Sequence, residues 1–388
     1  MVLLQYYYPA FKGGGPIRSL SNMAERLGDQ VRFRIVARDR DYGDPSGFPG
    51  ILSDKWQTVG RAEVNYRTPA AIRLLPMLQV LRQTSYEVLY LNSLLNWQFS
   101  IAPLVWRRLG LLPKRPVLLA PRGELSQGAL AQKPAKKRVY IRVAKMLGLV
   151  RGVTWHASSG LEKEEIERWF PRSGRDGGPP EVRIALNLSP TPETMEAPPL
   201  PVRKTVGTLR LAFVSRLTPK KNLAYLLRLL PGLRGEIALD VFGPTGRDPG
   251  YWQTCRRLIA EMPAHVSVTY RGPIPNEQVP EVFAAHHLFC FPTLGENYGH
   301  VVLESLQAGC PVVISDRTPW QDLDAKGVGW VIPLEEADRY AQVLQQVVEM
   351  DQAAFDAYSK RARAYAKEAA CDSAVLQQNR QLFDGLVE

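Results

Sequence analysis

Residues 288–315 read LFCFPTLGENYGHVVLESLQAGCPVVIS. The first four residues are apolar and predict a buried strand that ends at Phe291, and a polar turn containing glycine follows it. A helical pattern then begins near Gly299 and stops at Gly309, before the next apolar run. Short, near-continuous apolar runs separated by a helix are typical of parallel strands that are covered on both faces. The stretch therefore predicts a strand–helix–strand unit of an α/β protein.

The same alternation continues in both directions along the chain. It predicts two Rossmann-like, doubly wound parallel sheets of the α/β class, one in each half. In such sheets ligands bind beyond the carboxyl ends of the strands, so the loops that follow strands are the candidate binding segments. The expected strands are Val2–Tyr6, Val31–Ala37, Val88–Leu91, Val117–Ala120, Leu209–Val214, Ala238–Phe242, Val266–Tyr270, Leu288–Phe291, Pro311–Ser315 and Trp330–Pro333.

The length of 388 residues also favours two domains, because a single core usually stops growing before that size. The segment Asn187–Pro201 contains five prolines and few apolar residues, which predicts an extended linker. We therefore expect an N-terminal domain over 1–190 and a C-terminal domain over 202–369. The tail is helical, and its last helix, about 370–388, is expected to pack back on the N-terminal domain.

The net charge of +11 is carried by the first half of the chain. Residues 1–200 contain 29 Lys and Arg against 17 Asp and Glu, whereas residues 201–388 contain 20 against 21. This asymmetry indicates an anionic partner for the N-terminal domain: a phosphorylated acceptor, an acidic membrane surface or nucleic acid. Nucleic acid is the least attractive, because no aromatic stacking pattern or known recognition module accompanies the charge, and we expect none.

Part of this charge lies in a basic run from Lys133 to Lys145 that also contains Val139, Ile141 and Val143. On a helix, this run gives a cationic face beside an apolar one. Such a helix can lie on a membrane surface, or it can be a solvated helix that covers the core. Peripheral contact of the basic N-terminal domain with the inner face of a membrane is therefore one of two open interpretations.

The compartment is indicated by what the chain lacks. Its four cysteines are far apart and form no C-x-x-C pair, which gives neither a disulfide framework nor a zinc site. Met1–Tyr8 is apolar but too short to cross a bilayer, and it is interpreted as a first strand. We expect a cytoplasmic protein.

The most informative chemical feature is a pair of glutamates, Glu296 and Glu304, in the opening stretch. Glu296 lies in the turn after the strand, and Glu304 lies on an otherwise apolar helix. The N-terminus of that helix offers backbone N–H groups and a partial positive charge, which suit a diphosphate. After the expected strand Leu209–Val214, Arg216 and Lys221 add cations that can neutralise a leaving pyrophosphate.

These segments resemble family 4 glycosyltransferases, which are retaining enzymes of the GT-B fold, with two Rossmann-like domains facing a central cleft. The resemblance covers the C-terminal domain well and the N-terminal domain more loosely. It implies that Glu296 contacts the donor sugar and that Glu304 holds the ribose hydroxyls. It further implies that the backbone of Asn297, Tyr298, Gly299 and His300 faces the diphosphate, and that Arg216 and Lys221 grip the phosphates. Where the family usually has Gly after that lysine, this chain has Asn222.

The resemblance also assigns N-terminal residues. Family members have a Gly-Gly loop that closes over the donor phosphate, which corresponds to Gly14 and Gly15 after the first strand. On these residues alone, a tight turn fits equally well. Relatives have a Pro-Arg-Gly stretch lining the cleft, so Arg122 or Glu124 could meet a sugar, although a surface turn fits equally well.

The motif Asp39-Arg40-Asp41 has the D-x-D form of metal-dependent transferases, but a charged loop after a strand is the favoured interpretation. We expect no metal and no cofactor, with a nucleoside diphosphate sugar as the donor substrate. The implied activity is transfer of a hexose-like sugar to a glycan or lipid-linked acceptor in polysaccharide assembly. A GT-B epimerase or hydrolase, and a scaffold that binds the sugar nucleotide without turnover, are the alternatives.

Overall fold

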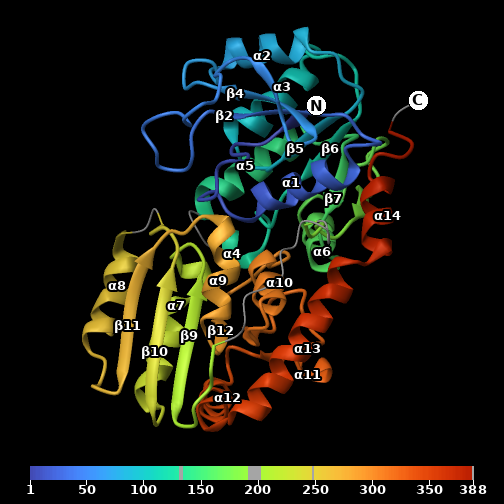
Figure 1. Ribbon diagram of the computed structural model, residues 1–388. Coiled ribbons are helices and arrows are strands. Elements are labelled where there is room, and N and C mark those ends of the chain that lie inside the picture. Colours follow the sequence, from blue (N-terminus) through green and yellow to red (C-terminus); the bar gives the residue numbers. More distant parts are fainter. Residues whose placement is uncertain (131–133, 191–201, 247–248, 387–388) are drawn as a thin grey trace. The chain divides into compact units, whose positions relative to one another are not determined.

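The computed structural model describes residues 1–130, 134–190, 202–246 and 249–386. The chain divides into two compact units, Met1–Thr191 with Asp372–Glu388, and Pro192–Cys371. In each unit a largely parallel sheet is covered by helices (Figure 1). Within the described ranges, none of the helices combines the length and the apolar character needed to cross a bilayer. Most of the segment predicted as a linker lies outside the described residues.

The N-terminal unit contains, among its described residues, a sheet of order β3-β4-β2-β1-β5-β6-β7-β8. Neighbouring strands pair in parallel, except that β3 and β4 are antiparallel. The strands are β1 (Val2–Leu3), β2 (Phe33–Arg38), β3 (Trp56–Val59), β4 (Ala62–Arg67), β5 (Leu89–Asn92), β6 (Val117–Ala120), β7 (Thr154–Ala157) and β8 (Glu181–Ile184). The helices are α1 (Gly15–Leu27), α2 (Leu74–Gln83), α3 (Ala102–Arg108), α4 (Gln127–Leu130), α5 (Pro134–Met146), α6 (Gly160–Trp169) and α14 (Ser373–Gln381), with a π-helical turn η1 (Trp97–Ile101).

The last helix, α14, belongs to the N-terminal unit. The segment after it is held there by Arg183, whose Nη1 donates to the carbonyl oxygens of Gln381, at 2.9 Å, and Leu382, at 3.1 Å. Phe383 packs edge-on against Phe33 of β2, with ring centroids 6.0 Å apart. The chain thus ends on the unit in which it begins.

The C-terminal unit contains, in its described part, a sheet of order β11-β10-β9-β12-β13-β14 whose neighbours are all parallel. The first three strands are added in one direction from β9 and the last three in the other, which is the order of the dinucleotide-binding fold. The strands are β9 (Thr208–Val214), β10 (Glu236–Phe242), β11 (Val266–Gly272), β12 (Leu288–Phe291), β13 (Val312–Ser315) and β14 (Gly329–Ile332). The helices are α7 (Leu223–Leu229), α8 (Pro249–Ala260), α9 (Val279–Ala284), α10 (His300–Gln307), α11 (Leu323–Lys326), α12 (Ala337–Glu349) and α13 (Gln352–Ala370), with the 3₁₀ turns η3 (Pro219–Lys221), η4 (Leu230–Gly232) and η5 (Asn276–Gln278).

The strand order explains why the central strands are apolar. All residues of β12 and β13 are buried, because helices cover both faces of the sheet there. The reversal of strand order falls between β9 and β12, so the loops after these two strands diverge to opposite faces. This divergence opens the crevice in which ligands of such sheets bind.

The predicted α/β class with two parallel sheets is confirmed, but several strands were missed or misjudged in length. β1 ends at Leu3, not at Tyr6 as predicted. β3 was missed because it is a partly exposed edge strand without an apolar run. β7 is wholly buried, but polar and apolar residues alternate in its sequence, TWHA, so a search for apolar runs does not find it.

We predict that Gly243→Ala destabilises the C-terminal unit by about 3 kcal/mol or more. Gly243 has φ 134°, and an added Cβ would lie 1.9 Å from the carbonyl oxygen of Ser215, just after β9. The matched control is Gly232→Ala, whose Cβ would meet nothing within 4 Å and which should change stability by about 0.5 kcal/mol at most. Urea unfolding of the two variants measures the difference, and equal midpoints would contradict the close approach.

Candidate functional site

The loop after β9 carries the predicted cations. Arg216 is exposed, and no hydrogen bond or ion pair of its side chain is found within the described part of the chain. The chain then forms η3 and enters α7 through Asn222, which has φ 61° and ψ 37°. Asparagine adopts this left-handed conformation more readily than other non-glycine residues. Asn222 therefore keeps the turn geometry for which family members usually have glycine.

The loop after β12 is bonded directly to the loop after β9. The carbonyl oxygen of Lys220 accepts from the backbone N–H of Leu294 at 2.8 Å and from Oγ1 of Thr293 at 3.0 Å. Ser315, at the end of β13, donates from Oγ to the carbonyl oxygen of Thr293 at 2.6 Å. Thr293 is fully buried, so these bonds are shielded from water. The ends of three neighbouring strands are thus joined at the reversal of strand order.

An ion pair forms at this junction between Lys221 Nζ and Glu296 Oε2. The two side chains are only 13% and 18% exposed, and the Lys221 ammonium also lies 4.9 Å from the centre of the Phe291 ring. Burial raises the pKa of Glu296, but the positive charges of Lys221 and Lys220 and two hydrogen bonds outweigh it, so the pKa falls to about 2. Glu296 is a carboxylate at any neutral pH.

The turn between Glu296 and α10 is held from the loop after β13. The N–H of Glu296 donates to the carbonyl oxygen of Arg317 at 2.9 Å, and Trp320 Nε1 donates to the carbonyl oxygen of Tyr298. Gly299 has φ 83°, and an added Cβ would lie 3.2 Å from Glu296 Cγ and 3.3 Å from Trp320 Nε1. A larger residue would therefore be strained in its backbone and would press on both neighbours.

Helix α10 begins directly after this turn, and in the described residues no side chain caps its N-terminus. The first N–H groups of a helix have no intrahelical acceptor, and with the helix dipole they make a favourable place for an anion. His300, the first residue, is buried, and its ring lies 4.8 Å from that of Tyr298. Glu304 is half-buried and lies one turn further along the same side of α10.

The structure thus brings together the predicted residues of the C-terminal unit. Lys221 and Glu296 are in contact, Arg216 lies on the β9 loop with Lys221, and Asn297–His300 form the turn that leads into α10. Thr293 and Trp320, which hold this arrangement, were missed. A threonine two residues after an apolar strand, in a loop expected to bind ligands, was the available signal for the first, and nothing local in the sequence indicated the second.

Comparisons with known proteins bear on the family and the fold of this chain. Residues 202–369 match the family model described as Glycosyl transferases group 1. This region is a group 1 glycosyltransferase domain. The D-inositol 3-phosphate glycosyltransferase of Mycolicibacterium smegmatis is 30% identical over 145 residues, which cover 37% of this chain and 33% of the relative. The chain therefore matches only about a third of the length of this curated relative.

Solved structures match over nearly the whole chain. The sucrose-phosphate synthase of Thermosynechococcus elongatus superposes with a TM-score of 0.71 at 17% identity, covering 99% of this chain and 98% of the other. The Anabaena protein Alr3699/HepE in complex with UDP-glucose superposes with a TM-score of 0.69 at 19% identity, with the same two coverages. At these identities the likeness establishes the fold, which is GT-B.

The N-terminal unit, which accompanies the group 1 domain, carries the predicted glycine loop after β1. Gly14 precedes α1 and Gly15 is its first residue. The loop is fixed by Asp41, whose Oδ2 accepts from the backbone N–H groups of Phe11 at 2.8 Å and Lys12 at 3.1 Å. This loop lies in a different unit from the residues around Glu296.

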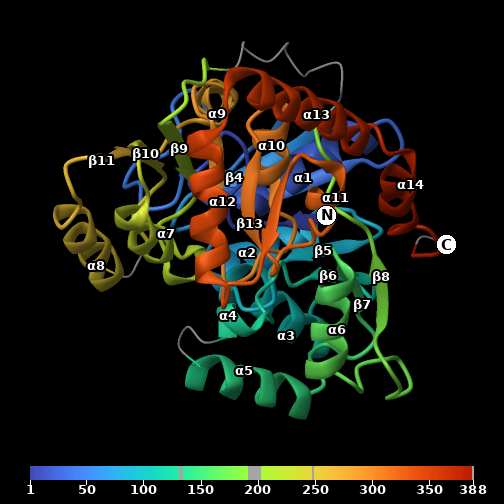
Figure 2. The same ribbon diagram turned by 90° about the horizontal axis from the view of Figure 1, so that it is seen from below.

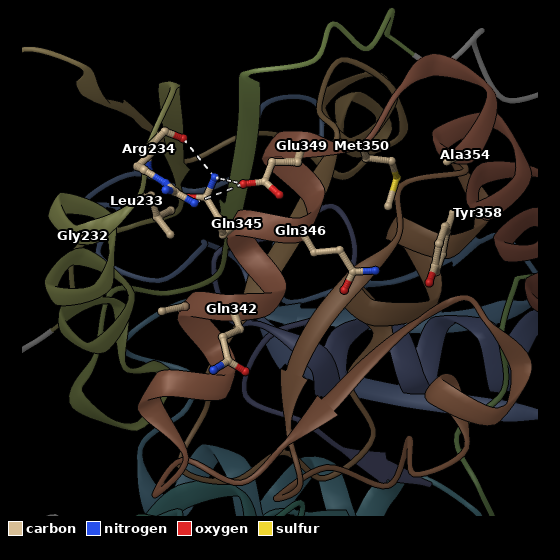
Figure 3. Close-up of a pocket in the computed structure, with 11 residues that line it drawn as sticks. Gly232, Leu233, Arg234, Gln342, Gln345, Gln346, Glu349, Met350, Ala354 and Tyr358 are labelled. Atoms are coloured by element: carbon tan, nitrogen blue, oxygen red, sulfur yellow. Dashed lines mark hydrogen bonds and ion pairs between the residues drawn. The ribbon is translucent and has the colours of Figure 1, made fainter.

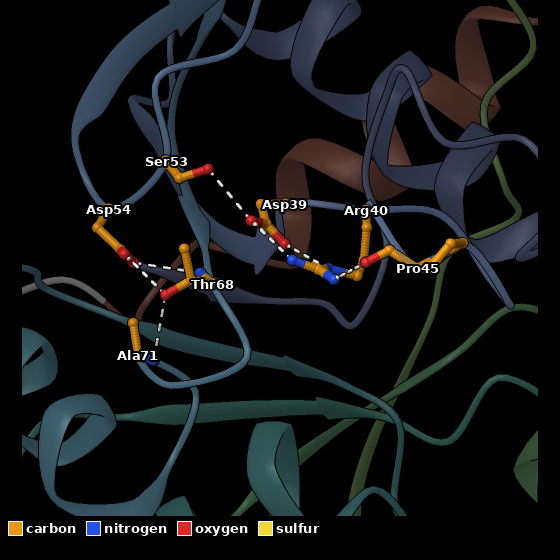
Figure 4. Close-up of polar contacts among 7 residues, drawn as sticks. All are labelled: Asp39, Arg40, Pro45, Ser53, Asp54, Thr68 and Ala71. Carbon is orange, nitrogen blue, oxygen red and sulfur yellow. Dashed lines mark hydrogen bonds and ion pairs between the residues drawn. The ribbon is translucent and has the colours of Figure 1, made fainter. Parts of the chain in front are cut away.

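The D-x-D motif serves the folding of its own loop. Asp39 is buried, pairs with Arg40 at 2.9 Å, and accepts from Ser53 Oγ at 3.2 Å (Figure 4). Arg40 also donates to the carbonyl oxygen of Pro45. Asp41 is occupied by the backbone N–H groups of the glycine loop and of Tyr42. The charged-loop interpretation therefore describes how both carboxylates are used.

Arg122 and Glu124 have supporting roles in the structure. Arg122 donates to Asn92 Oδ1 from two nitrogens, to Asn187 Oδ1 at 2.8 Å and to Tyr90 Oη at 2.8 Å. Glu124 accepts from Ser93 Oγ and from the N–H groups of Leu94 and Leu95 at 2.6 and 2.8 Å. Burial raises the pKa of Glu124 despite these bonds. Both side chains are committed to fixing the loops after β5 and β6.

His156 continues this network as a neutral residue. Burial and the nearby charge of Arg122 lower its pKa to about 3. Its Nε2 lies 2.9 Å from the carbonyl oxygen of Ala185, so it must carry the proton there, and Nδ1 accepts from the Tyr90 hydroxyl at 2.5 Å. The buried chain of donors from Arg122 through Tyr90 to His156 is thereby satisfied without any charge on the imidazole.

A separate pocket of about 730 Å³ lies at the opposite end of the group 1 sheet, beside the amino end of β10 (Figure 3). Its rim carries the ion pair between Arg234 and Glu349, at 3.5 Å. None of the predicted donor residues lines it. It is lined by Gly232, Leu233, Arg234, Ala341, Gln342, Gln345, Gln346, Glu349, Met350, Ala354 and Tyr358. Because ligands of parallel sheets bind at the carboxyl ends of strands, we do not assign the donor to this pocket.

We predict that Lys221→Met raises the pKa of Glu296 from about 2 toward its ordinary value of 4.5, because the largest opposing effect on the desolvated carboxylate is then removed while Lys220 remains. The depressed pKa contributes stability that is present above pH 4.5 and is lost as the pH falls through about 2. The stability difference between wild type and variant should therefore shrink over that range.

The pKa is measured by carbon-13 NMR titration of the glutamate carboxyls. The exposed Lys360→Met on α13 is the control and should leave the Glu296 titration unchanged. A Glu296 pKa that stays near 2 in Lys221→Met would show that the ion pair is not the cause of the depression.

Proposed function

We propose that the protein is a retaining glycosyltransferase that moves a sugar from a nucleoside diphosphate sugar to a hydroxyl of a glycan or lipid-linked acceptor. The observation that carries the proposal is the meeting of Lys221, Glu296 and the N-terminus of α10 where the strand order reverses. A diphosphate needs cations and N–H donors, and a sugar needs a carboxylate acceptor for its hydroxyls. Lys221, Glu296 and the first turn of α10 supply both at one junction of loops.

In this proposal each residue has a separate task. The diphosphate lies against the first turn of α10, with Arg216 and Lys221 as its counter-charges in place of a metal ion. Glu304 accepts hydrogen bonds from the ribose hydroxyls, and Glu296 accepts them from the donor sugar. The bond between the anomeric carbon and the diphosphate oxygen breaks, the acceptor hydroxyl oxygen bonds to that carbon, and the hydroxyl proton passes to the leaving diphosphate. The charge of the leaving diphosphate is stabilised by Arg216 and Lys221.

The ion pair between Lys221 and Glu296 explains how the site changes when the donor binds. Before the donor arrives, Lys221 neutralises Glu296, so neither charge is left unpaired in a half-buried place. A bound diphosphate competes for Lys221 and frees Glu296 oxygens for the sugar hydroxyls. One similar solved structure holds UDP-glucose, which supports the donor class, and one curated relative is a D-inositol 3-phosphate glycosyltransferase, which supports the transfer of a sugar.

The test is a transfer assay with labelled UDP, GDP and ADP sugars, with and without a lipid extract as acceptor source. Label that appears in an acceptor only when extract is present supports the transferase. Donor isomerised or hydrolysed without any acceptor would favour an epimerase or hydrolase. Saturable donor binding with no product under either condition would favour a scaffold.

We predict that Arg216→Ala lowers kcat about 100-fold while the melting temperature stays within about 2 °C of wild type. Arg216 is exposed and without a side-chain partner in the described ranges, so folding should not depend on it. Arg256→Ala, an exposed arginine on α8, is the control and should leave kcat unchanged. A large loss of stability with unchanged kcat would show that Arg216 supports the fold and does not act on the donor.

We predict that Glu304→Ala weakens binding of the nucleoside diphosphate about tenfold or more, because charged hydrogen bonds to the ribose are lost. Glu261→Ala, an exposed acid next to α8, is the control. Calorimetric titration with the free diphosphate separates this effect from catalysis. Equal affinity in wild type and Glu304→Ala would remove Glu304 from the donor site.

A further inference from the structure

Helix α5 carries two sets of apolar side chains that differ in burial. Ile141 and Ala144 are buried in the core of the N-terminal unit. Val139 and Met146 on the same helix are 58% and 75% exposed, and Val143 is also exposed. The helix therefore presents an apolar set to solvent in addition to the set that covers the core.

The exposed set forms a regular surface. Val139, Val143, Met146 and Leu147 follow one another at i, i+4, i+7 and i+8, which places them in one row along the helix. Exposed cations accompany this row: Arg138, Arg142 and Lys145 have the same spacing one position earlier and lie along one side of it, and Lys136 lies on the row itself, one turn before Val139. An apolar row with cations along one side and at its first turn thus faces away from the core. Lys133 of the basic run lies outside the described residues.

The neighbouring end of α3 extends this surface. Arg108 at the end of α3 donates from Nε to the carbonyl oxygen of Leu147 at 3.3 Å, which places the two helix ends side by side. Leu109, the next residue, is 66% exposed, and Leu111 is exposed as well. Figure 2 shows α5 along the outer edge of the N-terminal unit, next to α3. We call this surface the α5 patch: Leu109, Leu111, Val139, Val143, Met146 and Leu147, with Lys136, Arg138, Arg142 and Lys145.

We propose that the α5 patch docks the N-terminal unit on an anionic lipid surface. The partner must bury an apolar row and supply negative charge beside it, and a leaflet with acidic headgroups does both. The apolar side chains enter the headgroup boundary, and the cations remain at the phosphates above it. A second copy of the chain fits less well, because two such patches facing one another bring their arginine rows together.

The proposal does not rest on the proposed catalytic function. The patch belongs to the N-terminal unit and contains no residue assigned to the donor. The charge asymmetry of the chain points the same way, since the first half holds the whole positive excess. Docking through α5 would leave the residues around Glu296 chemically unchanged, so lipid binding and catalysis can be tested separately.

The experiment is co-sedimentation of the full chain with sucrose-loaded vesicles. One set contains phosphatidylcholine with about 30% phosphatidylglycerol, and the other contains phosphatidylcholine alone. We expect at least about tenfold tighter binding to the acidic vesicles, and a fall in binding as salt rises. Equal binding to both sets, or no binding to either, would overturn the proposal.

Two double variants separate the contributions. Arg138→Ser with Arg142→Ser should weaken binding to acidic vesicles about 25-fold, because each cation near such a surface contributes about fivefold. Val139→Ser with Met146→Ser should weaken it about tenfold or more while leaving the charge unchanged. The control, Leu52→Ser with Arg82→Ser, removes an exposed apolar residue and an exposed cation of the same unit elsewhere and should bind as wild type does.

Two further measurements make the result decisive. Melting temperature and donor affinity of all variants should match wild type, since the changed side chains are exposed and lie outside the donor site. Sedimentation velocity without lipid should give the same species for wild type and variants. The contrary outcome has two parts: the wild type is a dimer that Val139→Ser with Met146→Ser converts to a monomer, and vesicle binding is the same in both proteins. This result would show that the α5 patch is an interface between copies, and it would overturn the proposal.

Discussion

The ion pair between Lys221 and Glu296 is the interaction on which the candidate site depends. It joins the loops after β9 and β12, the two strands between which the strand order of the C-terminal sheet reverses. At that point the chain leaves the sheet in opposite directions, which opens a crevice at the ends of these strands. Both side chains are largely buried, and each charge offsets the desolvation cost of the other.

The same principle of construction is used in both units. Loops that follow strands are fixed by buried polar groups: Thr293 in the C-terminal unit, and Asp41 and Glu124 in the N-terminal unit. These groups accept hydrogen bonds from backbone atoms or donate hydrogen bonds to them, and in this way they fix the conformation of the loops. The groups left for a ligand are those outside such bonds, as the exposed Arg216 illustrates. A motif of chemically active residue types, such as Asp39-Arg40-Asp41, can therefore be entirely structural.

Much of the fold could be predicted because the buried parallel strands appear as plain apolar runs. The predictions of two sheets and of the α/β class are confirmed, as is the predicted family for residues 202–369. Strands β6 and β12 also have the predicted bounds. Edge and mixed strands such as β3 and β7 could not be found, since their burial is set by neighbours distant in the chain. The roles assigned to Glu296, Glu304, Gly14 and Gly15 stay predictions.

The sequence by itself determined the local elements, the turn residues and the chemistry available in each loop, because these depend on residue type and short-range spacing. It could not determine which loops meet. The tertiary structure decided that Thr293 bonds to Lys220 and that Trp320 holds Tyr298. It also decided that Val139 faces solvent while Ile141 faces the core. The physical reason is that burial and pairing are properties of the packed chain, in which residues about 70 positions apart become neighbours through parallel strand order.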